Sequence, residues 1–442
     1  MLAAAPVPPM SAHSLMLFLL QLGLLLLLAL VLGKLAGLCK MPAVVGELCA
    51  GVILGPSLLT QIAPGFSHWL LPADSEQFHL LDGVGQLGVL LLVGVTGAHL
   101  DLALVRKRVG TVTKISAFGL VIPLGFGVAA GLLLPAMLVG ENNNRTVFAL
   151  FLGVAMCVSA IPVIAKTLFD MNLLHRNVGQ LTLAAGMVDD VFGWFMLSVV
   201  SAMATTGLRT SNVLLSIACI AGVVLVAALS RPLVRRIFKL AGRTAAPGPT
   251  IATFVVLILL AAAGTHALAL EAVFGAFVCG ILINRYGKPD PAKLAPLRTF
   301  VLGVLAPIFF ATAGLRMDLT ALAEPPVLLA GLAVLAIAVL GKFAGAYLGA
   351  RTSRLTRWEA LALGAGMNAR GVIEVIVAMV GLRLGVLNTE MYTIIVLVAV
   401  VTSLMAPPIL RVAMKRVEYT AEEEIRRNAN LPPALDGRVR DN

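Results

Sequence analysis

The sequence predicts an all-α polytopic membrane protein, and three observations carry that prediction. Of the 442 residues, 59% are hydrophobic and only 12% are charged, whereas a soluble domain carries roughly 25% charged residues. The apolar residues come in runs of about 20, the length of a helix that crosses the hydrocarbon core of a bilayer. Lys and Arg gather in alternate loops between these runs, a pattern typical of cytoplasmic loops.

The apolar runs predict about thirteen transmembrane helices, each of roughly membrane-crossing length. Residues 13–33 lack a basic N-terminal region and are as long as a full span, so we interpret them as the first helix rather than a signal peptide. The expected helices are 13–34, 42–60, 82–99, 110–137, 146–170, 176–206, 211–240, 249–267, 270–284, 296–315, 326–350, 358–382 and 388–412.

The loop charges predict an orientation in the membrane. One set of loops holds most of the Lys and Arg, including the clusters at 106–108, 231–243 and 285–298, whereas the opposite set holds Arg145, Arg209, Arg316 and Arg383. Because cytoplasmic loops are enriched in Lys and Arg, we expect the protein to lie in the cell (inner) membrane with its N-terminus outside and its C-terminus in the cytoplasm. This placement accounts for the net charge of +11, so no nucleic-acid partner is expected.

Two short segments recur along the chain. Residues 46–51 resemble residues 275–280, and residues 97–102 resemble residues 314–319. Both pairs are seven expected helices apart, and because seven is odd the two halves run in opposite directions through the membrane. Inverted repeats of this kind are typical of secondary transporters, which bind substrate near the midplane between the halves.

Two adjacent acids lie in the middle of the helix expected at 176–206. An ionisable residue inside a span costs roughly 2.5–3.5 kcal/mol on insertion scales, and Asp189 and Asp190 follow each other directly. Consecutive helical residues point about 100° apart, so the two carboxylates have different surroundings. We expect one to face a water-filled cavity and the other to face a counter-charge, and a structural ion pair is the alternative reading.

Lys342 is the candidate counter-charge. It lies in the middle of the helix expected at 326–350, too deep to reach the interface easily. The small residues Gly341, Ala344 and Gly345 beside it allow a neighbouring helix to approach closely. We therefore expect Lys342 to pair with Asp189.

Two further helices carry signs of interruption. The helix expected at 146–170 contains Pro162 inside an apolar span, and a proline there leaves a backbone carbonyl without its hydrogen bond. The helix expected at 358–382 contains a glycine-rich stretch. Unwound backbone at this depth is tolerated only inside protein or beside a cavity, so we expect the two breaks to cross near Asp190. Arg370 and Glu374 are also an i,i+4 pair, for which a structural and a functional role stay open. The residues expected to line the breaks are Ser159, Ala160, Pro162, Asn368, Arg370 and Glu374.

These motifs together resemble the monovalent cation:proton antiporter superfamily, in its second branch with bacterial sodium/proton antiporters and plant cation/H+ exchangers. The resemblance covers about 13–415. It rests on Ser159-Ala160-Ile161-Pro162, Asp189-Asp190, Gly341-Lys342 and Met367-Asn368-Ala369-Arg370-Gly371 with Glu374. It implies that Asp190 carries the ion, that Asp189 is its partner and that Lys342 acts as the switch.

The resemblance also implies an organisation. A transmembrane antiporter domain would span 1–416, with core helices at about 110–206 and 326–412, dimerisation or scaffold helices at about 13–99 and 211–315, and a short cytoplasmic tail at 417–442. A homodimer and an elevator-like movement of the core follow from the same resemblance. Related potassium-efflux proteins carry a long nucleotide-binding domain after the last helix, and the short tail argues against that type of control.

The expected function is secondary active exchange of a monovalent cation, Na+ or K+, for protons, with a role in pH homeostasis. No cofactor is expected, no metal beyond the transported cation and no enzymatic activity. The five cysteines are scattered without metal-ligand spacing. The alternatives are a symporter or exporter of an organic solute on a similar scaffold, and a membrane sensor or intramembrane enzyme. The few aromatic residues, 3 Trp and 4 Tyr, do not favour an organic-solute cavity.

Overall fold

The computed structural model describes residues 11–39, 41–72, 75–98, 108–141, 144–161, 164, 168, 171–206, 210–268 and 270–424. In these ranges the chain is helical, and an antiparallel bridge between Val139 and Leu387 is the only extended pairing. Nine of the helices in this part of the chain are long and apolar enough to cross a membrane. Two bent helix pairs and two shorter apolar helices lie among them. The all-α membrane fold is therefore confirmed, while the exact number of thirteen spans stays a prediction.

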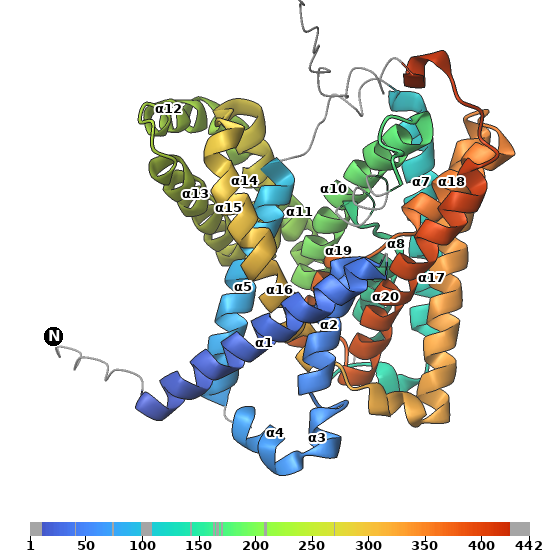
Figure 1. Cartoon of the computed structure of the whole chain (residues 1–442). Coiled ribbons are helices and arrows are strands. Elements are labelled where there is room, and N and C mark those ends of the chain that lie inside the picture. The colour runs from blue at the N-terminus through green and yellow to red at the C-terminus, as the bar shows by residue number, and fades with distance from the viewer. Residues whose placement is uncertain are drawn as a thin grey trace, which may run out of the picture.

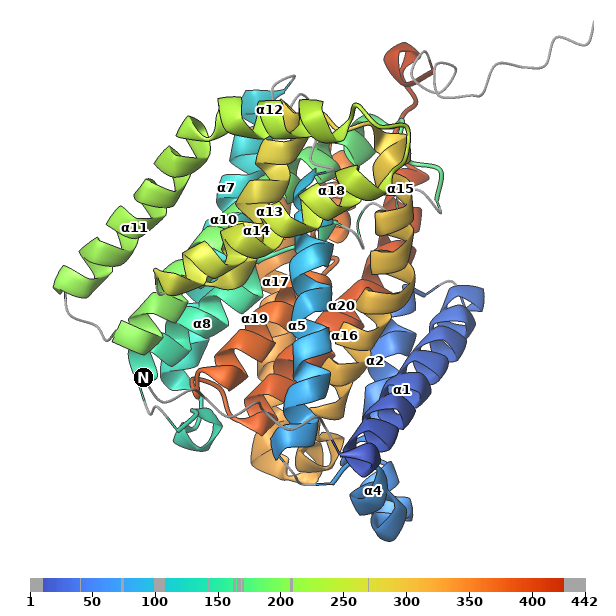
Figure 2. The ribbon, with the colours of Figure 1, turned by 90° about the vertical axis from the view of Figure 1, so that its left-hand side faces the viewer.

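One group of helices comes from the N-terminal quarter and the middle of the chain (Figures 1 and 2). Its members are α1 (Ala12–Leu38), α2 (Ala43–Leu54), α5 (Ser75–Ala98), α11 (Thr210–Leu229), α12 (Arg231–Ala241), α13 (Gly248–Ala267), α14 (Ala272–Leu282), α15 (Pro291–Phe300) and α16 (Ala306–Leu315). Short helices connect them: α3 (Leu59–Ile62), α4 (Pro64–Leu70), and the π-helical turns η2 (Ile283–Gly287) and η3 (Val301–Leu305). We call this set the scaffold group.

The other set, the core group, lies beside it in Figure 1. It contains α7 (Val109–Leu133), α8 (Arg145–Cys157), α10 (Asn177–Thr206), α17 (Pro325–Thr352), α18 (Arg357–Met367), α19 (Val372–Arg383) and α20 (Thr389–Met414), with the 3-10 turns η1 (Ala136–Leu138) and η4 (Leu319–Ala323). α7 packs against both α8 and α17. The roles of the two groups as a mobile core and a dimerisation scaffold stay a prediction.

The inverted repeat is visible in how the helices of the scaffold group pair. α2 packs against α16, and α14 packs against α5. A Cβ on Gly51 would lie 1.9 Å from the carbonyl oxygen of Ala311, and a Cβ on Gly280 would lie 2.3 Å from that of Gly94, so glycine is required at both crossings. The recurring segments therefore make equivalent close contacts in the two halves, although residues 99–102 of the second pair lie outside the described residues.

Two expected helices differ from the structure. The segment expected at 211–240 is bent by 50° between α11 and α12, because Pro232 at the start of α12 cannot continue the hydrogen bonding of α11. The segment expected at 42–60 ends as α2 at Leu54, and α3 and α4 follow. Pro64 occupies the first position of α4, which suits a residue without a backbone N–H.

Candidate functional site

Two interrupted helices meet in the core group. α8 ends at Cys157, and Val158, Ser159 and Ala160 are not helical. α18 ends at Met367 and α19 begins at Val372, bent by 43° from it. The backbone N–H of Ala160 donates to the carbonyl of Ala369 at 3.1 Å. The two breaks therefore touch, as the sequence predicted, while the predicted Pro162 lies outside the described residues.

Side-chain hydrogen bonds support the second broken helix. Thr356 and Glu359 form a capping box at the start of α18, which fixes where that helix begins. Asn368 is the last residue before the interruption, and the side chain of Ser403 in α20 donates to the carbonyl of Arg370. A buried carbonyl without a helical partner needs such a donor. The interruption is thus stabilised by side chains from neighbouring helices.

Asp189 and Lys342 form an ion pair at the centre of the core group. The Lys342 Nζ lies 2.5 Å from the Asp189 Oδ2, and both side chains are 0% exposed. Lys342 also donates to the carbonyls of Gly119 and Cys157, so its three N–H groups each have an acceptor. The pairing predicted from the depth of the two residues is present in the structure.

Ser159 connects this pair to the crossing. Its Oγ lies 2.9 Å from the Asp189 Oδ2 and 2.8 Å from the carbonyl oxygen of Met367. A hydroxyl donates one hydrogen bond at a time, so Ser159 bonds alternately to the carboxylate and to the second break. Asp189 is thereby held from two sides, by Lys342 of α17 and by Ser159 of the α8 break.

Asp190 has different surroundings. It is also 0% exposed, but neither of its carboxylate oxygens accepts a well-formed hydrogen bond from a described residue. The backbone N–H of Ile161 provides a weaker contact. A buried carboxylate without donors is costly unless it holds a proton or a cation. Asp190 is therefore the less compensated member of the pair in this structure.

Other buried oxygen atoms in or near the two breaks are also without described donors. They are the Oδ1 of Asn368 and the second carboxylate oxygens of Asp189 and Glu374. Oxygen ligands of this kind suit hard cations. Asn368 therefore belongs with the aspartates in the candidate site, whereas Ala160 contributes its backbone N–H to the crossing.

Arg370 acts on the end of α8. Its guanidinium donates to the carbonyls of Ala155 at 3.0 Å and Met156 at 2.6 Å, and to Ala338 of α17 at 2.9 Å. The last carbonyls of a helix have no partner within that helix and favour a cation nearby. Lys342 donates to the next carbonyl, that of Cys157. Two cationic side chains therefore donate hydrogen bonds to the last three carbonyls of α8. Sequence reasoning missed this contact, which requires the crossing itself.

Glu374 pairs with Arg370 within the second broken helix. Its Oε1 accepts from Arg370 at 3.1 Å, and both side chains are almost fully buried. The pair therefore places a counter-charge beside the guanidinium that contacts the end of α8.

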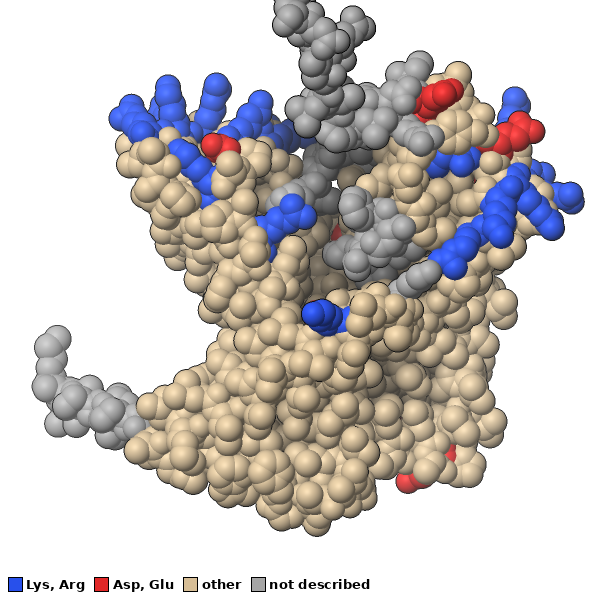
Figure 3. All heavy atoms as spheres, viewed as in Figure 1, with Lys and Arg blue, Asp and Glu red and all other residues tan. Residues whose placement is uncertain are grey.

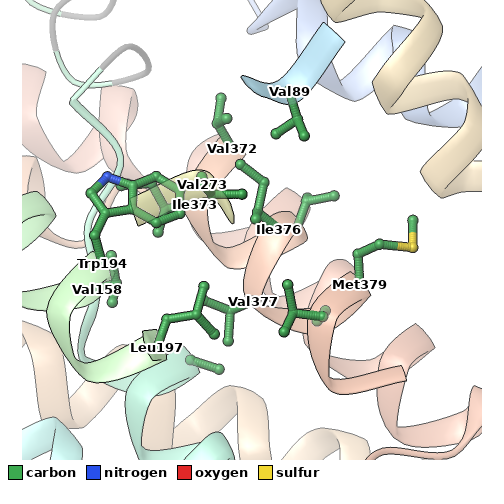
Figure 4. Close-up of a cluster of buried hydrophobic side chains, with 14 of the residues drawn as sticks. Val89, Val158, Trp194, Leu197, Val273, Val372, Ile373, Ile376, Val377 and Met379 are labelled. Carbon is green, nitrogen blue, oxygen red and sulfur yellow. The ribbon is translucent and has the colours of Figure 1, made fainter. Parts of the chain in front are cut away.

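An apolar cluster lies next to the aspartates, between the core and scaffold groups (Figure 4). Trp194 and Leu197 of α10 meet Val158 and the α19 residues 372–379, with Val273 of α14 and Val89 of α5 facing them. The ring of Trp194 is 6.0 Å from that of Phe277 in α14. The described side chains of this cluster are hydrophobic, and the indole N–H of Trp194 has no hydrogen-bond partner among the described residues.

A salt bridge lies at the far end of the same interface. Arg383, at the end of α19, contacts Glu271 at 2.8 Å, and Glu271 directly precedes α14. It thus joins the core group to the scaffold group.

The fold and this site define a membrane transporter of the crossing broken-helix type. The signature of the transmembrane sodium/hydrogen exchanger family matches residues 23–416, and the chain belongs to that family, whose members are secondary antiporters rather than enzymes. The cyanobacterial Na+/H+ antiporter NhaS4 of Synechocystis is 30% identical over 408 residues, covering 91% of this chain and 98% of that protein.

Longer relatives match as well. Cation/H+ antiporter 18 of Arabidopsis thaliana is 29% identical over 93% of this chain and 51% of its own length. The K+/H+ antiporter 1 of Saccharomyces cerevisiae is 27% identical over 97% of this chain and 49% of its length. The chain thus spans about half of these longer proteins.

A solved structure shows the same fold. The sodium proton antiporter MjNhaP1 from Methanocaldococcus jannaschii, at pH 8, superposes with a TM-score of 0.68 at 18% sequence identity. The match covers 91% of this chain and 99% of that one.

Proposed function

We propose that this protein exchanges Na+ or K+ for protons across the membrane at Asp190. The observation that carries the proposal is the contrast within the pair: Asp189 is held by Lys342 and Ser159, whereas the buried Asp190 accepts no well-formed hydrogen bond from a described residue. One carboxylate that holds either a proton or a cation couples the two fluxes. The similarity to the Na+/H+ antiporter NhaS4 and to the yeast K+/H+ antiporter 1 supports antiport and leaves both cations open.

The lysine gives the exchange its switch. When a cation occupies the site, its charge competes with that of Lys342 for Asp189, and when the cation leaves, the ion pair re-forms. Side chains from both breaks, Ser159 and Asn368, would supply further oxygens to the cation. Arg370 holds the geometry of the α8 end, and Glu374 provides its counter-charge.

Movement of the core group against the scaffold group would expose the site to each side in turn. The apolar cluster of Figure 4 supports this part of the proposal, because it offers a contact surface without directional bonds. Inverted repeats are the usual basis of such alternating access. Two copies joined through their scaffold groups would form the homodimer.

The distribution of charge supports the proposed orientation. Lys and Arg gather along the upper edge of the molecule in Figure 3, over α12 and near α18. Cytoplasmic surfaces carry this excess, which would put the start of α10 and residues 417–424 inside and Arg383 outside. The inner membrane of a cell is the proposed location.

Proton flux in everted vesicles tests the function. Na+, K+ and Li+ are added in turn to vesicles with an imposed proton gradient, at several pH values. Wild type should dissipate the gradient with the transported cation, and Asp190→Asn should abolish that response. Cation-dependent flux that survives Asp190→Asn would overturn the assignment. Thr96→Val, a replacement in α5 outside the site, is the control.

A further inference from the structure

An apolar groove of about 570 Å³ lies in the scaffold group, away from the aspartates, between α11, α12, α13 and α14. We call it the α11–α14 groove. Its walls include Gly222, Val226, Leu233, Leu260, Gly264 and Leu282. The polar side chains in its wall are already occupied: Ser230 donates to Ala227, and Thr265 donates to carbonyls of its own helix turn. The groove therefore fits an apolar chain and offers no polar partner along its length.

The spacing of the helices makes the groove. A Cβ on Gly222 of α11 or on Gly264 of α13 would meet no atom within 4 Å. At the close helix crossings of the scaffold group, such as those at Gly51 and Gly280, a Cβ would clash with the backbone of the neighbouring helix. Gly222 and Gly264 thus lie in the walls of this groove without bringing two helices together, whereas Gly275, also in its wall, is a close crossing of α14 on α13. Its volume falls in the usual range for ligand sites, roughly 300–1,000 Å³.

The amphipathic helix α12 covers one end of the groove. Its residues Leu233, Val234 and Ile237 line the groove, while its basic residues Arg231, Arg235, Arg236 and Lys239 are exposed. The helix is bent by 50° from α11 and runs across the ends of α13 and α14 (Figure 2). Such a helix lies in the plane of the headgroups with its apolar face toward the acyl chains.

The charge at this end of the groove is not neutralised by the protein. None of the four bases of α12 forms an ion pair with a described residue. Between residues 230 and 300 the sequence has two acids. Glu271 pairs with Arg383 and Asp290 accepts from the N–H of Ala292. Figure 3 shows the resulting basic surface over α12.

We propose that the α11–α14 groove binds one anionic phospholipid from the leaflet on the α12 side, with an acyl chain between α11 and α13 and its phosphate at the bases of α12. Acyl chains are as apolar as the groove, so the groove alone does not choose among lipids. The choice comes from α12, where each Lys or Arg near an anionic headgroup contributes about fivefold in affinity. This inference does not depend on ion exchange at Asp190.

Lipid titration of the purified protein tests the proposal. Delipidated protein in detergent receives dioleoyl-phosphatidylglycerol or dioleoyl-phosphatidylcholine. Native mass spectrometry counts the retained lipid, and the midpoint of thermal unfolding reports stabilisation. Wild type should retain one phosphatidylglycerol in preference to phosphatidylcholine, and its midpoint should rise with phosphatidylglycerol. Equal retention of the two lipids would overturn the proposal.

Two variants separate the groove from the bases. Gly222→Leu with Gly264→Leu fills the groove and should abolish retention of phosphatidylglycerol. Arg235→Gln with Arg236→Gln should lower the preference for phosphatidylglycerol by about fivefold for each charge. Retention by the glycine variant equal to wild type, or an unchanged preference in the arginine variant, would refute the site. If the glycine variant does not fold, the arginine variant decides.

Matched control variants test whether the two effects are specific to the groove and to the bases of α12. Gly23→Leu with Gly125→Leu adds the same side chains at exposed helical positions where a Cβ also meets no atom within 4 Å. Arg411→Gln with Lys415→Gln removes two exposed charges at the end of α20. Both controls should bind phosphatidylglycerol like wild type. Loss of binding in either control would show a general effect of surface chemistry and refute the site.

Discussion

The Nζ of Lys342 lies 2.5 Å from the Oδ2 of Asp189, whereas the next residue of the chain, Asp190, has only the weaker contact from the backbone N–H of Ile161. One helix thus presents a compensated charge and an uncompensated one in succession. Consecutive positions on a helix differ by about 100°, so α17 contacts only the first aspartate. The difference between the two carboxylates supports the assignment of exchange to Asp190.

Lys342→Met should destabilise the protein and abolish exchange. Removing one member of a buried ion pair costs about 3–5 kcal/mol, because the other charge stays buried without a partner. The carbonyls of Gly119 and Cys157 lose their donor as well. Thermal unfolding in detergent and cation-dependent proton flux are the measurements.

A second substitution distinguishes charge from packing. Lys342→Met combined with Asp189→Asn removes both charges and should recover much of the lost stability while exchange stays impaired. If the double variant is as unstable as the single one, the ion pair is not the source of the effect.

Arg370→Ala should be the most destabilising substitution outside the aspartate pair. It leaves the carbonyls of Ala155, Met156 and Ala338 without their donor, and it leaves Glu374 buried without its ion-pair partner. A buried carbonyl that loses its partner costs about 1–3 kcal/mol, so the summed loss should be several kcal/mol. The midpoint of thermal unfolding measures it.

Glu374→Gln is the matched comparison. It keeps a side chain that accepts from Arg370 and removes one buried charge, so the loss of stability should be much smaller than for Arg370→Ala. Equal losses would mean that the ion pair, rather than the capping of α8, explains the role of Arg370.

The part of the site that follows from burial could be predicted from the sequence. A charge in the middle of an apolar helix must find a partner, so Lys342 and Asp189 are predictable from depth alone. The breaks follow from glycine and from an interior proline. The contact of Arg370 with α8 was not predictable, because its acceptors are backbone carbonyls that every residue carries and only the crossing brings them together.

The fold shows the same limit. Helix existence followed from hydropathy, but the bend between α11 and α12 was missed although Ser230-Arg231-Pro232 is a recognisable helix start. The Arg383–Glu271 contact joins residues 112 positions apart. No local pattern predicts that pair, since its position depends on how the two groups pack.

Arg383→Gln should favour opening of the site to the outside. The contact with Glu271 is the salt bridge at the end of the apolar cluster that the proposed orientation places outside. The Arg383 side chain is 42% exposed and that of Glu271 is 7% exposed, so water still screens the pair and it contributes modestly. An exposed pair is worth about 0.2–1 kcal/mol, which shifts the population by at most about fivefold. Ile376→Cys, in a variant with the five native cysteines replaced by alanine, should react faster with an impermeant maleimide added outside.

Charge exchange gives the control for this contact. Glu271→Arg with Arg383→Glu restores the attraction and should return the labelling rate toward that of the parent. Labelling in Arg383→Gln that equals the parent would show that this contact does not stabilise the closed state.

Residues 417–424 hold the start of α10, the helix of both aspartates. Glu423 accepts from the backbone N–H of Asn177 at 2.6 Å and lies 3.2 Å from the Nε of Arg176, whose guanidinium stacks on Tyr419. Burial alone would raise the pKa of Glu423, but hydrogen bonds from the N–H groups of Asn177 and Thr420, together with Arg176, outweigh it and lower the pKa from its usual 4.5. The folded state therefore favours the ionised carboxylate.

The sign of this shift fixes the pH dependence of the contact. Because the folded pKa is lowered, the stabilisation is fully present above about pH 4.5 and is lost as the pH falls through the folded value. At neutral pH, Glu423→Gln should therefore loosen the start of α10 and speed hydrogen exchange over residues 177–182. Glu424→Gln, an exposed neighbour, is the control and should leave the exchange rate unchanged. If Glu423→Gln matches wild type at pH 7, the carboxylate does not hold α10, and the contact is only a packing of Tyr419 on Arg176.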